Sequence, residues 1–337
     1  MNLPSGTEGS TESSGAGDPS YVPAGDLAQA RALLDAPGAV PLGGGTDLVP
    51  SIRERLVRPR ALVDLARISD LRGIAWREDG SALIGAATTL AAIASDGRMR
   101  TAFPAVVRAC ELVGSPALRN MGTLGGNLCQ RPRCWYFRQR LPCHKHGGSH
   151  CYAYHGENEH HAILGGGPCF IVHPSDTAVA LMALGATLHV TGQRTGERAI
   201  AIEDFFVLPA RRIDSENVLT DGEAIRAVEL PALSSGKRQA FDKVTQRGAW
   251  DFAVVSVAWA RRTDGSVRLV LGGVAPIPWR VTTSIEEDVA SGTLGEDDVD
   301  TLAERALHDA RPLAKNGYKV DLAGALLRRA IVDLNSP

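Results

Sequence analysis

The sequence lacks long apolar segments: it contains no run of eighteen apolar residues, and no apolar stretch typical of a secretion signal follows Met1. We therefore expect neither a membrane span nor a secretion signal on this chain. An excess of charge is also missing, because 36 Lys and Arg residues oppose 38 Asp and Glu residues and leave a net charge of −2. Neither a nucleic acid nor an anionic membrane surface is therefore an expected partner.

Cysteine is scarce outside one segment. Five of the six cysteines lie close together, at Cys129, Cys134, Cys143, Cys151 and Cys169, in a segment rich in Arg, His, Gly and aromatic residues. Clustered thiolates in a loop-like segment are what a metal or iron–sulfur centre requires. Disulfides would be favoured in a small secreted protein, but a chain of 337 residues has enough apolar residues to form a core without them. The histidines among these cysteines leave a zinc site as an alternative to iron.

The rest of the chain is typical of an α+β protein with at least two domains. Residues 1–20 are rich in Ser, Gly, Thr and Glu, and we expect a disordered tail there. Apolar periodicity predicts helices at 26–36, 103–113, from 175 onward, at 299–310 and at 322–334. Strands are expected at 39–42 and 61–65, in a hairpin at 72–86, and in a second hairpin whose turn is Asp264-Gly265.

The sequence also contains two glycine-rich loops. The first is Gly43-Gly44-Gly45-Thr46, between a predicted strand and a predicted helix, and the second covers residues 119–127. Glycine lets the backbone approach a ligand closely, and amide groups near a helix N-terminus can bind phosphate oxygens. The first loop has neither the dinucleotide G-x-G-x-x-G pattern nor the P-loop pattern. Two such loops could hold a pyrophosphate between them, and two unrelated tight turns remain an alternative.

Taken together, these motifs resemble the FAD-binding medium subunits of the molybdenum hydroxylase family, which includes xanthine dehydrogenase, carbon monoxide dehydrogenase and aldehyde oxidoreductases. The resemblance rests on residues 42–48, 118–127, 173–176 and 271–275. It implies an α+β fold with a two-part FAD-binding domain of the PCMH type, similar to vanillyl-alcohol oxidase. A C-terminal α+β domain like that of the carbon monoxide dehydrogenase flavoprotein would follow. We expect the FAD-binding domain at 21–208 and the C-terminal domain at 209–337.

The resemblance also implies which residues contact FAD. Those of the two loops are Leu42, Gly43, Gly44, Gly45, Thr46, Asp47, Leu48, Arg119, Asn120, Gly122, Thr123, Gly125, Gly126 and Asn127. Asp176 belongs to a third segment that contacts the flavin in the family. Trp250 stands where the relatives have an aromatic ring near the isoalloxazine, and a core tryptophan at a strand edge is an equal alternative.

The cysteine segment narrows the resemblance. Residues 130–137, 142–145 and 167–176 are similar to the FAD subunit of heterotrimeric bacterial aldehyde oxidoreductase, which carries an additional [4Fe–4S] cluster. The resemblance implies a cluster loop at about 128–170 with the ligands Cys134, Cys143, Cys151 and Cys169, whereas proximity in sequence would choose Cys129 in place of Cys169. His161, in a His-Ala-Ile element shared with the relatives, receives no role.

Five basic residues surround the cysteines: Arg131, Arg133, Arg138, Arg140 and Lys145. Positive charge near a cluster would raise its reduction potential. A solvated basic face, or a docking face for a partner, is the alternative.

The resemblance implies an oxidoreductase subunit without catalytic residues of its own, and no Ser/His/Asp or paired-carboxylate arrangement contradicts this. An aldehyde or related substrate would be oxidised at a molybdenum cofactor on a large partner subunit. Electrons would pass through a small subunit with two [2Fe–2S] clusters to FAD on this chain, and then to an external acceptor. The complex would be cytoplasmic, or periplasmic if exported on a partner's twin-arginine signal. A stand-alone FAD-dependent oxidoreductase and a flavin-free scaffold holding a zinc loop remain alternatives.

Overall fold

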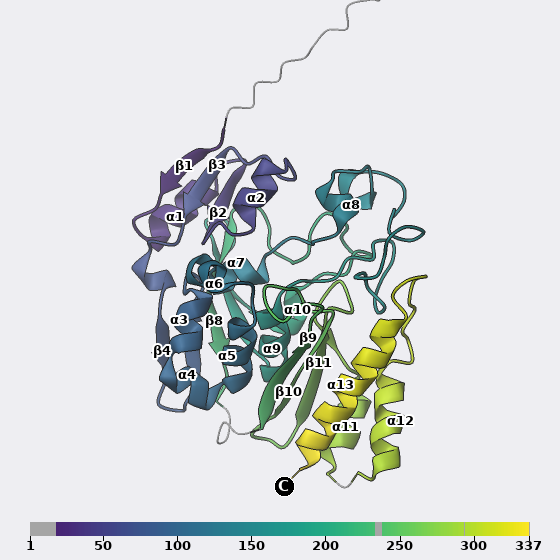
Figure 1. The fold of residues 1–337 in the computed structure, drawn as a ribbon. Helices are drawn as coiled ribbons and strands as arrows, with labels where there is room; N and C mark the ends of the chain where they lie inside the picture. Colours follow the sequence, from purple (N-terminus) through teal and green to yellow (C-terminus); the bar gives the residue numbers. More distant parts are fainter. Residues whose placement is uncertain (1–17, 233–237, 293, 337) are drawn as a thin grey trace, which may run out of the picture.

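The computed structural model describes residues 18–232, 238–292 and 294–336. The described chain begins with a small parallel sheet, ordered β1-β3-β2 (Figure 1). Its strands are β1 (Ser20–Pro23), β2 (Ala39–Leu42) and β3 (Ala61–Asp64), joined through α1 (Leu27–Leu34) and α2 (Leu48–Arg53). Helical crossovers of this kind allow neighbouring strands to run parallel. Of the tail predicted at residues 1–20, positions 1–17 lie outside the described residues. Ser20 belongs to β1, so regular structure begins one residue earlier than the sequence predicts.

A five-stranded antiparallel sheet follows, in the order β4-β5-β8-β6-β7. Its strands are β4 (Ile74–Trp76), β5 (Ala82–Gly85), β6 (Thr187–Gly192), β7 (Gly196–Ala201) and β8 (Glu223–Leu230). The short helices around it are η1 (Ser69–Leu71), α3 (Leu90–Ser95), α4 (Gly97–Ala102), α5 (Pro104–Glu111), α6 (Pro116–Met121), α7 (Leu124–Leu128), α9 (Asp176–Leu184) and α10 (Ile202–Phe205). The largest apolar core lies between this sheet and helices α3, α5 and α9. The predicted hairpin of β4 and β5 is confirmed.

Strand β8 changes the expected domain division. Residues 223–230 lie beyond the predicted boundary at 208/209, yet β8 pairs with both β5 and β6. A division at 208/209 would separate β8 from the strands that satisfy its backbone hydrogen bonds. We propose instead that the FAD-binding domain ends after Leu230. The apolar residues of 223–230 come in adjacent pairs without strict alternation, and such a local pattern carries no information on the partners of a strand.

The C-terminal part is a four-stranded antiparallel sheet in the order β12-β11-β10-β9, with strands β9 (Gln239–Val244), β10 (Val255–Arg261), β11 (Val267–Gly272) and β12 (Trp279–Arg280). The predicted hairpin through Asp264-Gly265 is confirmed as β10 and β11. Helices α11 (Thr283–Ala290), α12 (Glu296–Ala306) and α13 (Tyr318–Asn335) supply the rest of its apolar core (Figure 1).

Helix α9 joins the two parts of the molecule. All nine of its residues are buried, and it packs against β10 and β11 as well as α5. A helix that is apolar all round requires such burial on every side. Gly272 permits the close approach, because a Cβ at this position would lie 2.6 Å from Val179 Cγ2 of α9.

The cysteine segment connects α7 to α9 and contains little regular structure. Its helices are α8 (Trp135–Arg138) and η2 (His144–His146). In Figure 1 it forms a separate lobe beside α2 and above the C-terminal helices. None of the helices in the described ranges has both the length and the apolar character needed to cross a membrane.

Candidate cofactor site

The two glycine-rich loops lie directly against each other. A Cβ at Gly44 would lie 1.7 Å from the carbonyl oxygen of Met121, and a Cβ at Gly43 would lie 2.5 Å from Thr123 Oγ1. Real Cβ atoms do not approach other atoms this closely, so these two positions require glycine for contact between the loops. The sequence predicts that the loops act together, and the structure brings them together.

The first loop presents unused amide groups. The backbone N–H groups of Gly44, Gly45, Thr46 and Asp47 donate to no acceptor within the described ranges. Gly45 has a φ of +70°, which lets the chain turn from β2 into α2. Successive free N–H groups at such a turn are the usual backbone site for phosphate oxygens. The loop therefore fits the pyrophosphate of a dinucleotide.

Two adjoining cavities extend from the loops. The loop cavity has a volume of about 330 Å³ and is lined by Thr46, Asp47, Gly122, Thr123, Gly126, Asn127 and Trp250 among others. The inner cavity, of about 350 Å³, reaches Asp176 and the edge of the cysteine segment. Both cavities are lined by Arg133, Arg247, Asp251 and Phe252, so they adjoin at these four residues, and the two cavities together are called the cleft below.

Eight predicted FAD residues therefore line the cleft, and eight do not. Outside its lining lie Leu42, Gly43, Gly44, Gly45, Leu48, Arg119, Asn120 and Gly125. Arg119 donates instead to the carbonyl oxygens of Val113 and Gly114, at 3.0 and 3.2 Å, and Asn120 is exposed.

The shared lining residues Asp251 and Phe252 were not predicted. Asp251 and Phe252 directly follow Trp250, so their position next to a predicted FAD residue could have indicated them.

Asp176 is engaged by a buried lysine. Its Oδ2 lies 2.6 Å from Lys243 Nζ, and both side chains are almost fully buried. The same ammonium donates to the carbonyl oxygens of Leu112 and Asp251, at 3.1 and 2.9 Å. Burial raises the pKa of Asp176, and Lys243 counteracts it. This pair holds the base of the cleft together across both parts of the molecule.

Trp250 lies at the rim of the cleft. Its side chain is 65% exposed and its φ is +52°, a conformation rare for a non-glycine residue. The alternative interpretation as a core tryptophan is therefore wrong. The ring is free to cover a ligand in the loop cavity.

Four cysteines line one small pocket. Cys134, Cys143, Cys151 and Cys169 surround it together with Lys145 and Ile171, whereas Cys129 lines a different pocket beside Gly43 and Gly125. All six cysteines are free thiols, and Cys110 is buried in the main core. Burial raises the pKa of Cys134 to about 11 and that of Cys169 to about 12.

The cysteine pocket is not arranged around a single point. In the described part of the chain, no three His, Cys, Asp or Glu side chains converge tightly enough to hold one metal ion. Zinc requires four ligands at about 2.0–2.3 Å from one centre. In a [4Fe–4S] cluster each thiolate binds a different iron atom, so its four ligands stand further apart. The structure therefore brings the four thiols around one small pocket of about 10 Å³ without a formed metal site in the described ranges.

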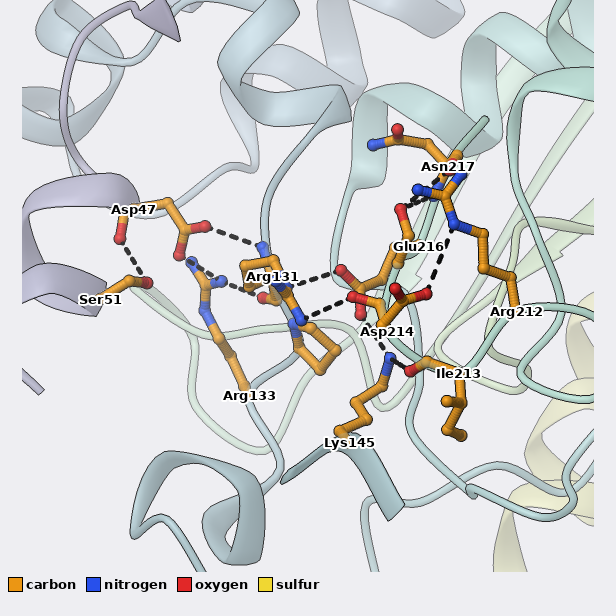
Figure 2. A network of polar contacts seen from close by, with 12 residues as sticks. Asp47, Ser51, Arg131, Arg133, Lys145, Arg212, Ile213, Asp214, Glu216 and Asn217 are labelled. Carbon is orange, nitrogen blue, oxygen red and sulfur yellow. Dashed lines mark hydrogen bonds and ion pairs between the residues drawn. The ribbon is translucent and has the colours of Figure 1, made fainter. Parts of the chain in front are cut away.

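The basic residues of the cysteine segment are paired with acids. Asp47 Oδ1 lies 2.7 Å from Arg133, and its Oδ2 accepts the backbone N–H of Arg131 at 2.8 Å (Figure 2). The same Oδ1 lies 3.1 Å from Arg138. Glu216 lies 2.6 Å from Lys145 and 2.7 Å from Arg131.

These ion pairs fasten the cysteine segment to the FAD-binding domain. The interpretation of a solvated basic face is therefore wrong for the four paired residues, and Arg140 alone of the five is exposed.

Comparison with known proteins agrees with this geometry. Residues 14–233 match the family described as "FAD binding domain in molybdopterin dehydrogenase", and residues 239–334 match "CO dehydrogenase flavoprotein C-terminal domain". The chain belongs to the FAD-binding medium subunits of the molybdenum hydroxylase family. It is an oxidoreductase flavoprotein subunit with the expected α+β fold of an FAD-binding domain and a C-terminal domain.

Several members of this family resemble the chain along most of its length. The aldehyde oxidoreductase FAD-binding subunit PaoB of Escherichia coli (strain K12) is 35% identical over 90% of this chain and 95% of its own. The glyceraldehyde dehydrogenase medium chain of Sulfolobus acidocaldarius is 28% identical over 87% of this chain and 88% of its own. Among solved structures, reconstituted CO dehydrogenase from Oligotropha carboxidovorans has a TM-score of 0.72 at 25% identity, covering 95% of this chain and 98% of its own.

Proposed function

We propose that this chain is the FAD- and [4Fe–4S]-binding electron-transfer subunit of a molybdenum-dependent aldehyde oxidoreductase complex. The observation that carries the proposal is the four-cysteine pocket beside the cleft that fits FAD. The aldehyde class rests on the similarity to a protein named as an aldehyde oxidoreductase FAD-binding subunit.

FAD would be held in the cleft by the glycine loops. The free backbone N–H groups of Thr46 and Asp47, which line the loop cavity, would donate to its pyrophosphate, and Trp250 would cover that cavity. FAD supplies two-electron storage at this position, because it can exchange electrons singly or in pairs. Arg133 and Arg247 line both halves of the cleft and would offset the negative charge of the phosphates.

The cluster ligands would be Cys134, Cys143, Cys151 and Cys169. Support comes from their common pocket and from the separate location of Cys129. Burial raises the pKa of Cys134 and Cys169, so binding of a metal by these residues would require their thiol protons to be released. The ion pairs of Asp47 and Glu216 hold the segment in place for this binding.

The partners would be a large subunit with the molybdenum cofactor and a small subunit with two [2Fe–2S] clusters. The chain cannot supply those further clusters, because only Cys110 and Cys129 remain after the four ligands. Electrons from the partners would reach FAD on this chain and leave to an external acceptor. The complex would be cytoplasmic, or periplasmic if a partner carries a twin-arginine signal.

The proposal is tested on the complex purified from cells that express all three subunits. We expect about four irons attributable to this chain and one FAD. Cys169→Ser should lose that iron, and the matched variant Cys129→Ser should keep it. Equal iron in both variants would disprove the ligand assignment. A chain with FAD that purifies alone would indicate a stand-alone flavoprotein, and one with zinc and no visible absorption would indicate a scaffold.

A further inference from the structure

His161 is in contact with one of the four cysteines. Its Nε2 lies 3.3 Å from Cys134 Sγ, and it is the one side chain in the described ranges that forms a hydrogen bond with any of the four sulfurs. Its ring is buried, and its Nδ1 has no hydrogen-bond partner in the same ranges.

The C-terminal domain fixes the position of His161. The His161 carbonyl oxygen accepts from Asn316 Nδ2 at 3.0 Å and from Lys319 Nζ at 3.1 Å. Its backbone N–H donates to the Asn158 carbonyl at 3.0 Å, and the Asn158 side chain accepts in turn from the backbone of Lys315 at 2.9 Å. Asn158 and the backbone of His161 are therefore both hydrogen-bonded to residues 315–319, where α13 begins.

The direction of the hydrogen bond follows from the state of the sulfur. In this structure Cys134 Sγ belongs to a free thiol, which stands in for the thiolate that binds iron. A thiolate has no proton and can only accept. With iron bound, His161 must therefore donate its Nε2–H to Cys134 Sγ.

This hydrogen bond lies between the cysteine pocket and the cleft. Of the four cysteines, only Cys134 lines both the cysteine pocket and the inner cavity. His161 lines the inner cavity on the same side. The donor therefore acts on the thiolate that faces the flavin site.

We propose that His161 is a positioning residue that stabilises the reduced form of the [4Fe–4S] cluster through its hydrogen bond to Cys134. The proposal rests on the proposed function, since it requires the cluster. Reduction adds negative charge to the cluster sulfurs, so an N–H donor stabilises the reduced form more than the oxidised form and raises the reduction potential. Asp47 and Glu216 offset part of the charge of the four paired basic residues, and none of these four side chains forms a hydrogen bond with a sulfur of the pocket in the described ranges.

The test compares three variants of the purified complex by a reductive titration monitored by electron paramagnetic resonance. His161→Phe removes the donor, and we expect an equilibrium constant for cluster reduction about tenfold smaller, which is about 59 mV for a one-electron couple. His161→Gln can still present an N–H near the position of Nε2 and should recover most of the potential. His160→Phe is the matched control, because His160 lines the same cavity without a sulfur partner, and its potential should stay unchanged.

The outcomes separate this proposal from the one it rests on. Wild-type complex without iron on this chain would refute the proposed function. Wild-type iron with the same potential in His161→Phe would overturn the role of His161 alone. If His161→Phe does not retain iron, the electron paramagnetic resonance spectrum of the reduced wild-type complex, labelled with ¹⁵N-histidine, replaces the titration as the test. A histidine nitrogen coupled to the cluster that disappears in His161→Gln supports the proposal, and the absence of any such coupling overturns it.

Discussion

Removing the charge of Glu216 should release the cysteine segment from the FAD-binding domain. Lys145 is 1% exposed and Glu216 4% exposed, and their charged atoms lie 2.6 Å apart. In Glu216→Gln, the Lys145 ammonium would remain buried without a counter-charge, and the amide NH2 group would face one of the two cations. Breaking a buried ion pair in this way costs about 3–5 kcal/mol.

We take the lower end of this range for two reasons. Arg131, the second partner of Glu216, is 26% exposed and can regain water. Its Nε–H is also not aligned for a hydrogen bond with the carboxylate, so that contact is purely electrostatic. A cost of about 3 kcal/mol corresponds to an opening equilibrium about a hundredfold larger.

Hydrogen exchange followed by mass spectrometry on the purified complex measures this opening. Peptides from residues 129–150 of Glu216→Gln should exchange about a hundredfold faster than in the wild type. Glu111→Gln is the control, since Glu111 pairs with Arg100 at the surface and should change exchange little. The double variant Lys145→Met/Glu216→Gln should recover most of the protection. Wild-type exchange in Glu216→Gln would refute the reasoning.

Two further predictions concern the loops and a buried lysine. Gly44→Ala should lose bound FAD, measured as flavin absorbance per purified complex, because its Cβ would lie 1.7 Å from the Met121 carbonyl oxygen; Gly97→Ala, which meets no atom within 4 Å, should keep it. Burial lowers the pKa of Lys319 from 10.5 to about 7. Between pH 7 and pH 10.5, Lys319 is therefore protonated in the unfolded chain and neutral in the folded chain. The free energy of unfolding should rise with pH across this range, because the unfolded state binds the additional proton. Urea unfolding should show this rise in the wild type and in the control Lys315→Met, but a flatter dependence in Lys319→Met; equal slopes in all three would contradict the assignment.

The sequence predicts local features of this protein well, because local features depend on neighbouring residues. Strand β2 follows from a short apolar run, and the hairpin of β10 and β11 follows from strand-like residues on both sides of the Asp264-Gly265 turn. The two loops and the cysteine segment could likewise be recognised from residue types and spacing. The resemblance to the FAD-binding medium subunits of the molybdenum hydroxylase family was confirmed by the match over residues 14–233, whereas the [4Fe–4S] cluster inferred from the cysteine segment stays a prediction.

Other features required the tertiary structure, because they depend on residues far apart in the sequence. The partners of β8 and the burial of α9 between the C-terminal sheet and α5 are set by long-range packing, which periodicity does not encode. The pairing of the basic residues with Asp47 and Glu216 has the same origin.

What the sequence determined by itself is the set of chemical groups, namely a pair of glycine loops that predict a dinucleotide site and a group of thiols that predict a metal centre. What only the tertiary structure decided is which groups meet. The fold brought Cys169 to the pocket of Cys134, Cys143 and Cys151 and left the nearer Cys129 outside. It also placed His161 against Cys134. The physical reason is that distance along a chain does not limit contact in a folded protein, since loop closure costs little more for a longer loop.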